Sequence, residues 1–253
     1  MTEFEGSDVF RPVILYEDNH VLAVRKVPGM LSQEDHTGDP DLLSELKEFL
    51  RVRDRKPGQA WLGLVHRLDR PTGGVMVFAK TSKAASRLSE SIRKRQIRKE
   101  YLVLCDGALG RPGDRRTFED VLSKDPHANH SRVLRPGTSA ADGHRKERSA
   151  RLELQVLAVD ASAQCSLAAV SLITGRSHQI RVQFAERGFP LAGDRKYGRE
   201  KPGDSAELGL WAYRLDIPHP TTKEMLTFMD WPEHRMWETL LTPQLRETLE
   251  KDG

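Results

Sequence analysis

The sequence lacks several features that mark common classes of protein. Its 253 residues include two cysteines, Cys105 and Cys165, which lie far apart in strand-like apolar runs. We therefore expect two reduced core thiols rather than a disulfide. Cysteine and histidine do not cluster with the spacing of metal ligands, and neither a GxGxxG motif nor a P-loop occurs. Nothing in the sequence therefore points to a bound metal or a nucleotide cofactor.

Long apolar runs are also missing. No segment approaches the roughly 20 apolar residues that a membrane-spanning helix needs. The first ten residues, MTEFEGSDVF, carry acids where a signal peptide would carry an apolar stretch. We therefore expect a cytoplasmic protein that does not contact membranes. Its 38% hydrophobic and 30% charged residues are typical of globular proteins, and the length suffices for one sizeable core.

The charge is modest in sum but uneven along the chain. The net charge is +3 with an isoelectric point of about 8.9, a weak indication of a polyanionic partner. Residues 91–100, SIRKRQIRKE, hold five basic residues and one acid. Taken alone, such a run is more typical of a solvated helix face than of a binding site.

Apolar periodicity and turn residues predict groups of strands with helices between them. Strands are expected on both sides of an Asp18-Asn19 turn and at 75–80, 101–105, 151–159 and 166–173. Helices are expected after Asp39-Pro40, with Asp39 as the cap, after Thr81-Ser82, at 177–187 before Gly188, and at 232–250. Residues 106–150 are polar and rich in Pro, Gly and His, which predicts irregular hairpins or a mobile insertion.

This order of elements favours an α+β fold around a largely antiparallel mixed sheet over a doubly wound parallel one. We expect a tail at residues 1–12 and one domain at 13–253, with 106–150 as a variable, insertion-like region. We find no internal repeat in the sequence.

Two polar segments stand out as candidate sites. Residues 64–80, LVHRLDRPTGGVMVFAK, place Asp69 and its polar neighbours between two apolar runs, on a loop that a strand holds from behind. Residues 174–183, TGRSHQIRVQ, place His178 and Arg181 three positions apart near a helix N-terminus. Arg181 is suited to pair with a carboxylate and keep it ionised. An Asp between two arginines is nevertheless more typical of a structural ion pair, so these patterns alone leave RNA binding an open alternative.

Five segments, in order, resemble the motifs of RluA-type pseudouridine synthases. Residues 66–74, HRLDRPTGG, resemble the signature HRLDxxTSG; 174–181, TGRSHQIR, are similar to TGRxHQIR; and 188–198, GFPLAGDRKYG, resemble GxPIxGDxxYG. Residues 99–101, KEY, match the K-x-Y element, and 16–29 resemble the opening of the domain. Gly73 stands where the family has Ser, and Pro28 is shifted by one position. No S4-like RNA-binding module precedes residue 13, so we expect a stand-alone catalytic domain and a monomer.

The resemblance implies a pseudouridine synthase fold and an enzyme that isomerises uridines in transfer or ribosomal RNA to pseudouridine. The target base must be flipped into a pocket, at a cost of a few kcal/mol. The resemblance implies Asp69 as the essential carboxylate, and Arg181 as the partner that holds it through a charge-assisted contact. Tyr101 is implied as the residue that stacks on the uracil and helps to remove the C5 proton. Ile180 is expected as an apolar wall, and Arg67 as the residue that fills the space of the flipped base.

The same resemblance extends to RNA contacts and to cofactors. His66 and His178 are expected to contact the substrate, and Arg93 and Arg95, in a predicted basic helix at 93–99, to contact phosphates. Arg115, Arg116 and Arg132 are expected to add contacts from the 106–150 region, which is predicted to set target choice. No cofactor and no metal are expected. Two alternatives stay open: a non-catalytic RNA-binding or ribosome-assembly factor on the same fold, and a glycosidase, although no second acid is obvious.

Overall fold

The computed structural model describes residues 10–125, 129–134, 147–160, 162, 164–198 and 207–251. The strands are β1 (Ile14–Glu17), β2 (Val21–Lys26), β3 (Gly63–Leu64), β4 (Gly73–Ala79), β5 (Arg98–Asp106), β6 (Arg115–Asp125), β7 (His130–Leu134), β8 (Glu147–Asp160), β9 (Cys165–Leu172), β10 (Leu210–Pro218) and β11 (Met225–Met229). The helices are α1 (Leu42–Arg53), α2 (Ser82–Arg93), α3 (Gln179–Glu186) and α4 (Pro243–Lys251), with a 3-10 turn, η1 (Arg235–Trp237). Most of the predicted tail, residues 1–9, lies outside the described residues, so the domain boundaries stay predictions.

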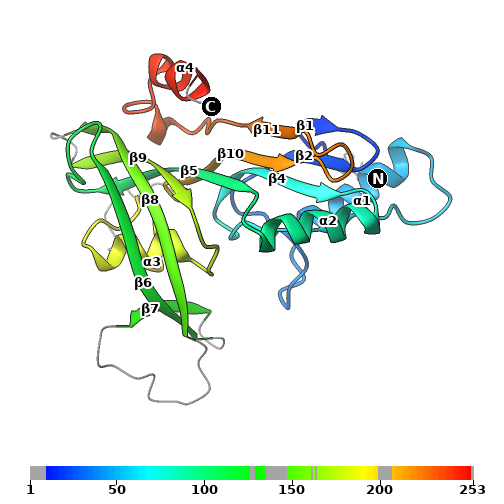
Figure 1. Ribbon diagram of the computed structural model, residues 1–253, viewed down its shortest axis with the longest axis horizontal. Coiled ribbons are helices and arrows are strands. Elements are labelled where there is room, and N and C mark those ends of the chain that lie inside the picture. Colours follow the sequence, from blue (N-terminus) through cyan, green and yellow to red (C-terminus); the bar gives the residue numbers. More distant parts are fainter. Residues whose placement is uncertain are drawn as a thin grey trace, which may run out of the picture.

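One sheet runs through the whole molecule (Figure 1). Its strand order is β1-β2-β4-β10-β5-β9-β8-β6-β7, with β3 beside β4 and β11 beside β10. These pairings are antiparallel except that of β4 with β10, which are far apart in sequence and parallel. The predicted α+β fold with a largely antiparallel mixed sheet is therefore confirmed. In the described part of the chain, no helix is long and apolar enough to cross a membrane.

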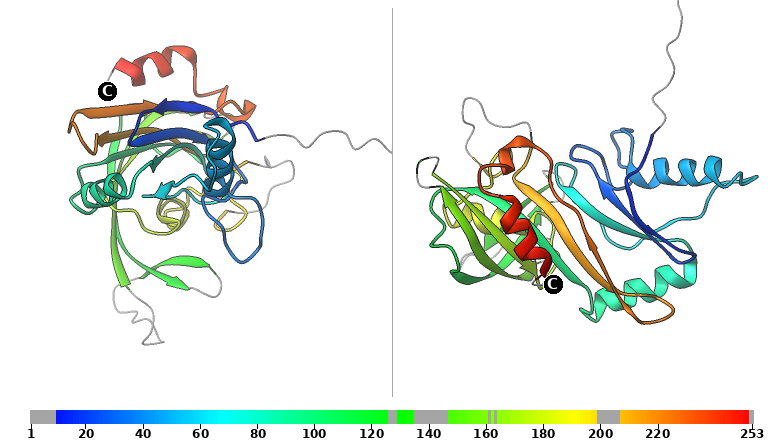
Figure 2. Two further views of the ribbon diagram at one scale, coloured as in Figure 1. Left: turned by 90° about the vertical axis from the view of Figure 1, so that its right-hand side faces the viewer. Right: turned by 90° about the horizontal axis from the view of Figure 1, so that it is seen from above.

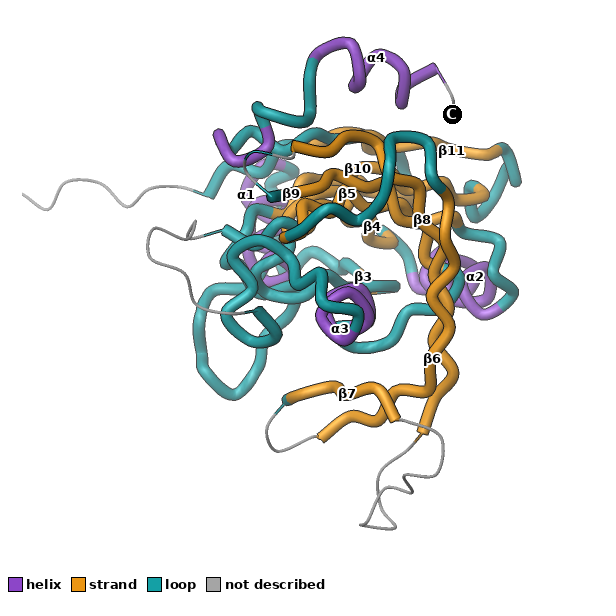
Figure 3. The backbone as a smooth tube through the Cα atoms, turned by 90° about the vertical axis from the view of Figure 1, so that its left-hand side faces the viewer, coloured by secondary structure: helices purple, strands orange, loops and turns teal. Residues whose placement is uncertain are grey.

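Both faces of the sheet are covered, which explains why its central strands are apolar throughout. In β4, Met76 and Phe78 join one apolar cluster, and Val75 and Val77 join another. Leucines of α1 pack into the first cluster, and Leu88 of α2 into the second. Figures 1 and 3 show α2 and α3 on one side of the sheet and α4 on the other. Seen from above in Figure 2, α4 lies over the strands.

The starts of α1 and α2 test the capping predictions. Thr81 caps α2 as predicted, because its side chain accepts a hydrogen bond from the N–H of Ala84. The prediction for α1 was wrong by two residues: Asp41 caps that helix and accepts from Ser44, whereas Asp39 forms an ion pair with Arg70. A carboxylate two positions upstream is equally suitable by type, so local sequence did not decide between them.

Three further expectations need correction. Residues 106–150 are not irregular, because β6 and β7 form a regular hairpin and β6 pairs with β8 over Arg115–Ser123, although 126–128 and 135–146 lie outside the described residues. The basic run is not a helix, since α2 ends at Arg93 and β5 begins at Arg98. The C-terminal helix is divided into η1 and α4, which begins at Pro243, a residue suited to a first helical turn because it lacks an N–H.

Gly73, the position that departs from the family signature, lies directly against Trp211 of β10. A Cβ at Gly73 would lie 2.2 Å from the Trp211 ring. The large indole therefore leaves no room for the usual serine.

Candidate active site

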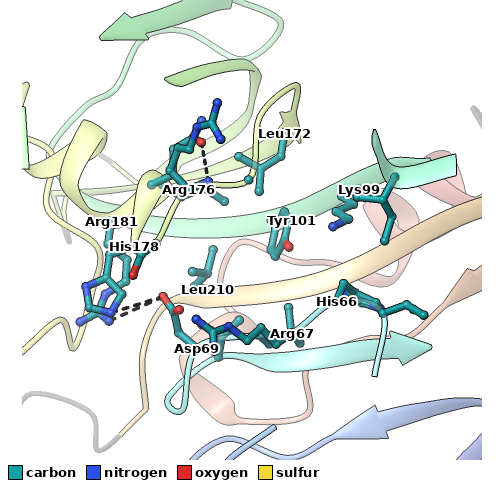
Figure 4. Close-up of a pocket in the computed structure, with 18 residues that line it drawn as sticks. His66, Arg67, Asp69, Lys99, Tyr101, Leu172, Arg176, His178, Arg181 and Leu210 are labelled. Carbon is teal, nitrogen blue, oxygen red and sulfur yellow. Dashed lines mark hydrogen bonds and ion pairs between the residues drawn. The ribbon is translucent and has the colours of Figure 1, made fainter. Parts of the chain in front are cut away.

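A pocket of about 310 Å³ opens between the loop that follows β3, the strand β5 and the start of α3 (Figure 4). It brings together seven residues chosen from the sequence: His66, Arg67, Asp69, Tyr101, His178, Ile180 and Arg181. These residues come from three segments, the first and last of which are more than a hundred positions apart. The sheet unites them because β5 lies between β10, the neighbour of β4, and β9, which leads to α3.

The loop that carries Asp69 is fixed by residues near the N-terminus. Ser32 Oγ donates to the carbonyl of Leu68 at 2.7 Å and accepts from its N–H at 3.2 Å. The buried ammonium of Lys26 and the backbone N–H of Gly29 both donate to the carbonyl of Arg70, at 3.0 and 2.9 Å. Burial lowers the pKa of Lys26 to about 7, against the opposing effect of the Asp69 charge. Hydrogen bonds therefore hold the backbone in place on both sides of Asp69.

Arg181 and Asp69 form an ion pair at 4.0 Å, and no hydrogen bond joins them. Arg181 Nε and Nη2 donate to the two carboxylate oxygens of Asp194, at 2.8 and 2.6 Å. Its Nη1 lies 4.0 Å from Oδ2 of Asp69. Burial alone would raise the pKa of Asp194, but hydrogen bonds from Arg181 and from backbone N–H groups hold it below its usual value. Asp194 therefore fixes the guanidinium in place, and the guanidinium faces Asp69 across the pocket (Figure 4).

His178 faces the same carboxylate from a second direction. It precedes α3 in a left-handed conformation, with φ of 54°, and its Nε2 lies 3.9 Å from Oδ2 of Asp69. Its Nδ1 lies 2.8 Å from the hydroxyl of Tyr197, which also accepts from the N–H of Ser131 at 2.8 Å. Because the hydroxyl accepts from Ser131, its own proton is available for Nδ1. We infer that the imidazole proton is on Nε2, facing Asp69.

Burial controls the protonation of the pocket. It lowers the pKa of His178 to about 4, against the opposing charge of Asp69, so the imidazole is neutral near pH 7. It also raises the pKa of Tyr101, and the charge of Asp69 raises it further. Tyr101 is only 7% exposed, and Ile180, which also lines the pocket, is 4% exposed. A phenol that stays protonated is better suited to stacking and hydrogen-bond donation than to accepting a proton.

Not every predicted contact residue lies free in the pocket. His66 lines it, but its Nε2 accepts a hydrogen bond from the N–H of Val77, and burial lowers its pKa to about 3. Its ring therefore joins the Asp69 loop to β4. Arg93 and Arg95 are exposed and follow Ile92, which lines the pocket, so they lie outside it.

The three arginines predicted in the 106–150 region are not in the pocket either. Arg115 and Arg116 line a separate hollow with Arg98, Glu100 and Glu153. Arg132 lies on β7. Asp194, Tyr197 and Lys99 were not predicted as site residues, although the 188–198 and 99–101 motifs contained them.

The pocket wall is rich in cations. Among its described lining residues, Arg67, Lys99, Arg176 and Arg181 carry positive charge, and Asp69 is the one carboxylate. Such a wall favours a polyanionic ligand. A glycosidase needs two carboxyl groups about the scissile bond, and this lining supplies one.

Comparison with known proteins also points to a protein that acts on RNA. The family model described as RNA pseudouridylate synthase matches residues 20–186. The uncharacterized RNA pseudouridine synthase YhcT of Bacillus subtilis is 32% identical over 224 residues, 84% of this chain and 66% of its own. Ribosomal large subunit pseudouridine synthase C of Salmonella typhimurium is 33% identical, over 85% of this chain and 64% of its own. This chain spans about two thirds of the length of these relatives.

A solved structure shows the same fold. The human RNA pseudouridylate synthase domain containing 1 superposes with a TM-score of 0.70 and 23% identity, covering 98% of both chains. At that level of identity the likeness establishes the fold alone.

Proposed function

Since this chain belongs to the RNA pseudouridylate synthase family, of RluA type, we propose that it isomerises uridines in RNA to pseudouridine, with Asp69 as the essential carboxylate. One observation carries the proposal: Asp69 lies in a cation-rich pocket beside the buried ring of Tyr101, and both Arg181 and His178 face it within 4.0 Å.

The reaction exchanges one glycosidic bond for another. The N1–C1′ bond of the uridine breaks, the uracil turns within the pocket, C5 bonds to C1′, the proton of C5 is lost, and N1 gains a proton. Atoms and electrons balance without a co-reactant. Asp69 either adds to the sugar or removes a sugar proton to give a glycal, and in both cases the carboxylate is the reacting group.

The neighbours of Asp69 have separable tasks. Tyr101 stacks on the flipped uracil, and Ile180 forms the apolar wall that excludes water. Arg181 faces the carboxylate with its guanidinium fixed by Asp194. Arg67 is exposed at the pocket and lies beside Asp69 in Figure 4, where it is placed to fill the space that the flipped base leaves in the RNA.

We place the substrate among structured RNAs of the cytoplasm, with large-subunit ribosomal RNA tested first and transfer RNA second. Relatives named for the large ribosomal subunit support that order. Structured RNA is recognised largely by shape and splayed bases, and the β6–β7 hairpin beside the pocket is a candidate contact. We expect the protein to act as a monomer and without a cofactor.

The test is a map of carbodiimide-reactive pseudouridines, by primer extension, in RNA from cells with and without the gene. The proposal predicts one or more stops that vanish in the deletion strain and return with the wild-type gene. Restoration by Asp69→Asn would reject Asp69 as the essential group. An unchanged map across ribosomal and transfer RNA would instead favour a non-catalytic RNA-binding factor.

A further inference from the structure

Lys99 lines the pocket at the end away from Asp69. Figure 4 shows Tyr101 between these two residues, with the Lys99 side chain reaching toward Tyr101 from the side opposite the carboxylate. Lys99 precedes Tyr101 by two residues on β5, so both side chains emerge on one face of the strand, about 7 Å apart. The three residues therefore follow one another along the pocket in the order Asp69, Tyr101, Lys99.

The ammonium of Lys99 has no partner in the part of the chain that the structure describes. It makes no hydrogen bond and no ion pair there, although it is partly buried, and burial lowers its pKa. His66, drawn at the same end of the pocket, already accepts a hydrogen bond at Nε2 from the N–H of Val77. An ammonium with restricted access to water costs folding free energy unless an acceptor reaches it. In this pocket the bound base is the group that can supply one.

The order of residues along the pocket fixes which edge of that base meets Lys99. The ribose that reacts must lie at Asp69, so N1 of a uracil stacked on Tyr101 points to that end. The ring atom opposite N1 is C4, and its carbonyl oxygen therefore points toward Lys99. This oxygen accepts a hydrogen bond in uracil, whereas cytosine carries an amino donor in its place.

The turn of the base keeps an acceptor at the same position. Bonding of C5 to C1′ requires half a turn of the ring about the axis through N3 and C6, which exchanges N1 with C5 and C4 with C2. The C2 carbonyl oxygen then lies where the C4 carbonyl oxygen was. While the N1–C1′ bond is broken, its electron pair belongs to the uracil and spreads onto both carbonyl oxygens. A cation fixed beside one of them stabilises that charge.

We propose that Lys99 donates a hydrogen bond to the uracil carbonyl oxygen farthest from the ribose, and so selects uracil over cytosine and stabilises the departing base. The proposal rests on the proposed function and adds to it the group that recognises the base. A site built to hydrogen-bond one group of its substrate rejects an analogue that lacks the group, because a buried polar atom is then left unpaired.

The experiment compares the wild type with Lys99→Met and with Lys47→Met, a control on α1 outside the pocket. Binding of fluorescein-labelled decauridylate and decacytidylate is titrated over a series of salt concentrations. We expect the wild type and Lys47→Met to prefer the uridylate by about tenfold or more, the usual size of a hydrogen bond to a charged group. Lys99→Met should bind the two alike. Its slope of log K against log salt should match that of the wild type, because a contact to a neutral carbonyl releases no counter-ion.

Two further measurements complete the test. Release of tritium from RNA labelled at C5 of uridine, in a single turnover at saturating protein, should be at least about tenfold slower for Lys99→Met. The Tm of RNA-free Lys99→Met should not lie below that of the wild type, because the substitution removes an unpaired ammonium.

Several results would overturn the assignment. A preference for uridylate that Lys99→Met keeps, or that the wild type lacks, would place Lys99 away from the base edge. A slope lower by about 0.7 in Lys99→Met would make it a phosphate contact. A lower Tm would make it a structural residue, and an unchanged single-turnover rate would remove it from the chemical step.

The binding measurement does not depend on turnover. An inactive wild-type protein with the expected preference for uridylate would therefore contradict the proposed isomerisation while leaving the contact between Lys99 and the base in place.

Discussion

Arg181 and Asp194 form a buried, bidentate ion pair, with donor–acceptor distances of 2.8 and 2.6 Å, directly behind the pocket. The third guanidinium nitrogen is left 4.0 Å from Asp69. Arg181 thus forms a hydrogen-bonded ion pair with Asp194 and a longer ion pair with Asp69. Asp194 is buried and fixes its position, whereas the Asp69 side chain lines the pocket and is 31% exposed.

Asp194→Asn should lower both stability and turnover. Removing one partner of a buried ion pair leaves an uncompensated charge, which typically costs about 3–5 kcal/mol. The freed Arg181 then no longer keeps its geometry toward Asp69, so we expect kcat to fall while RNA affinity changes little. Urea denaturation and single-turnover kinetics measure the two effects.

Asp120→Asn is the matched control for that variant. Asp120 accepts from Arg187, at the far end of the same helix, in a more exposed pair that does not line the pocket. It should cost less stability and leave kcat unchanged. Wild-type turnover by Asp194→Asn would show that Arg181 needs no support from Asp194.

Tyr197→Phe should reduce kcat by about five- to tenfold, with KM nearly unchanged. The substitution removes the hydroxyl that donates to Nδ1 of His178, so the imidazole proton is no longer directed to Nε2, facing Asp69. One hydrogen bond of about 1 kcal/mol sets the expected size. Tyr16→Phe removes a hydroxyl that donates to Asp18, and neither residue lines the pocket, so this variant should leave kcat as it is. A purely structural Tyr197 would lower Tm without this selective loss of kcat.

Gly73→Ser, which restores the usual family residue, should destabilise this protein by about 1–3 kcal/mol, the typical cost of overpacking. The new side chain would meet the ring of Trp211. Combining it with Trp211→Leu should cost less than the sum of the two single changes, because the smaller side chain leaves room. Additive free energies of unfolding in that double-mutant cycle would contradict the steric explanation.

Folding stability should decrease as the pH falls below about 6.5. His178 and His66 have folded-state pKa values of about 4 and about 3, against 6.5 for the ordinary side chain. In this range the unfolded chain binds protons that the folded protein does not, so each histidine lowers stability by about 1.4 kcal/mol per pH unit. Glu17, with a folded-state pKa of about 2, contributes in a lower window, below about 4.5. Urea denaturation between about pH 7.5 and 5 tests this, and His178→Gln should make the slope shallower.

Sequence alone was sufficient for the fold class and for the seven pocket residues, because their motifs are contiguous segments. The cap at Thr81 and the strands around the Asp18-Asn19 turn also follow from local rules. The prediction for residues 106–150 was wrong because a polar composition does not distinguish a loop from a hairpin with few buried side chains, which here include Phe118 and Leu122.

The relationships across the site required the structure. Which of two carboxylates binds Arg181 depends on how the segment at 188–198 returns to α3, and no spacing rule specifies that. The link from Ser131 through Tyr197 to His178 joins segments that are 19 to 66 positions apart in sequence, so only the folded chain reveals it. The absence of a partner for Lys99 among the described residues likewise depends on tertiary packing.

Release of tritium from RNA labelled at C5 of uridine tests the central claim most directly, because forming the C5–C1′ bond must expel the hydrogen of C5. Purified wild-type protein and Asp69→Asn are each incubated with labelled large-subunit ribosomal RNA and transfer RNA from the deletion strain. The account predicts release by the wild type and none by Asp69→Asn, although both bind the RNA equally well. Equal release by the two proteins would contradict the assignment of Asp69 as the essential carboxylate.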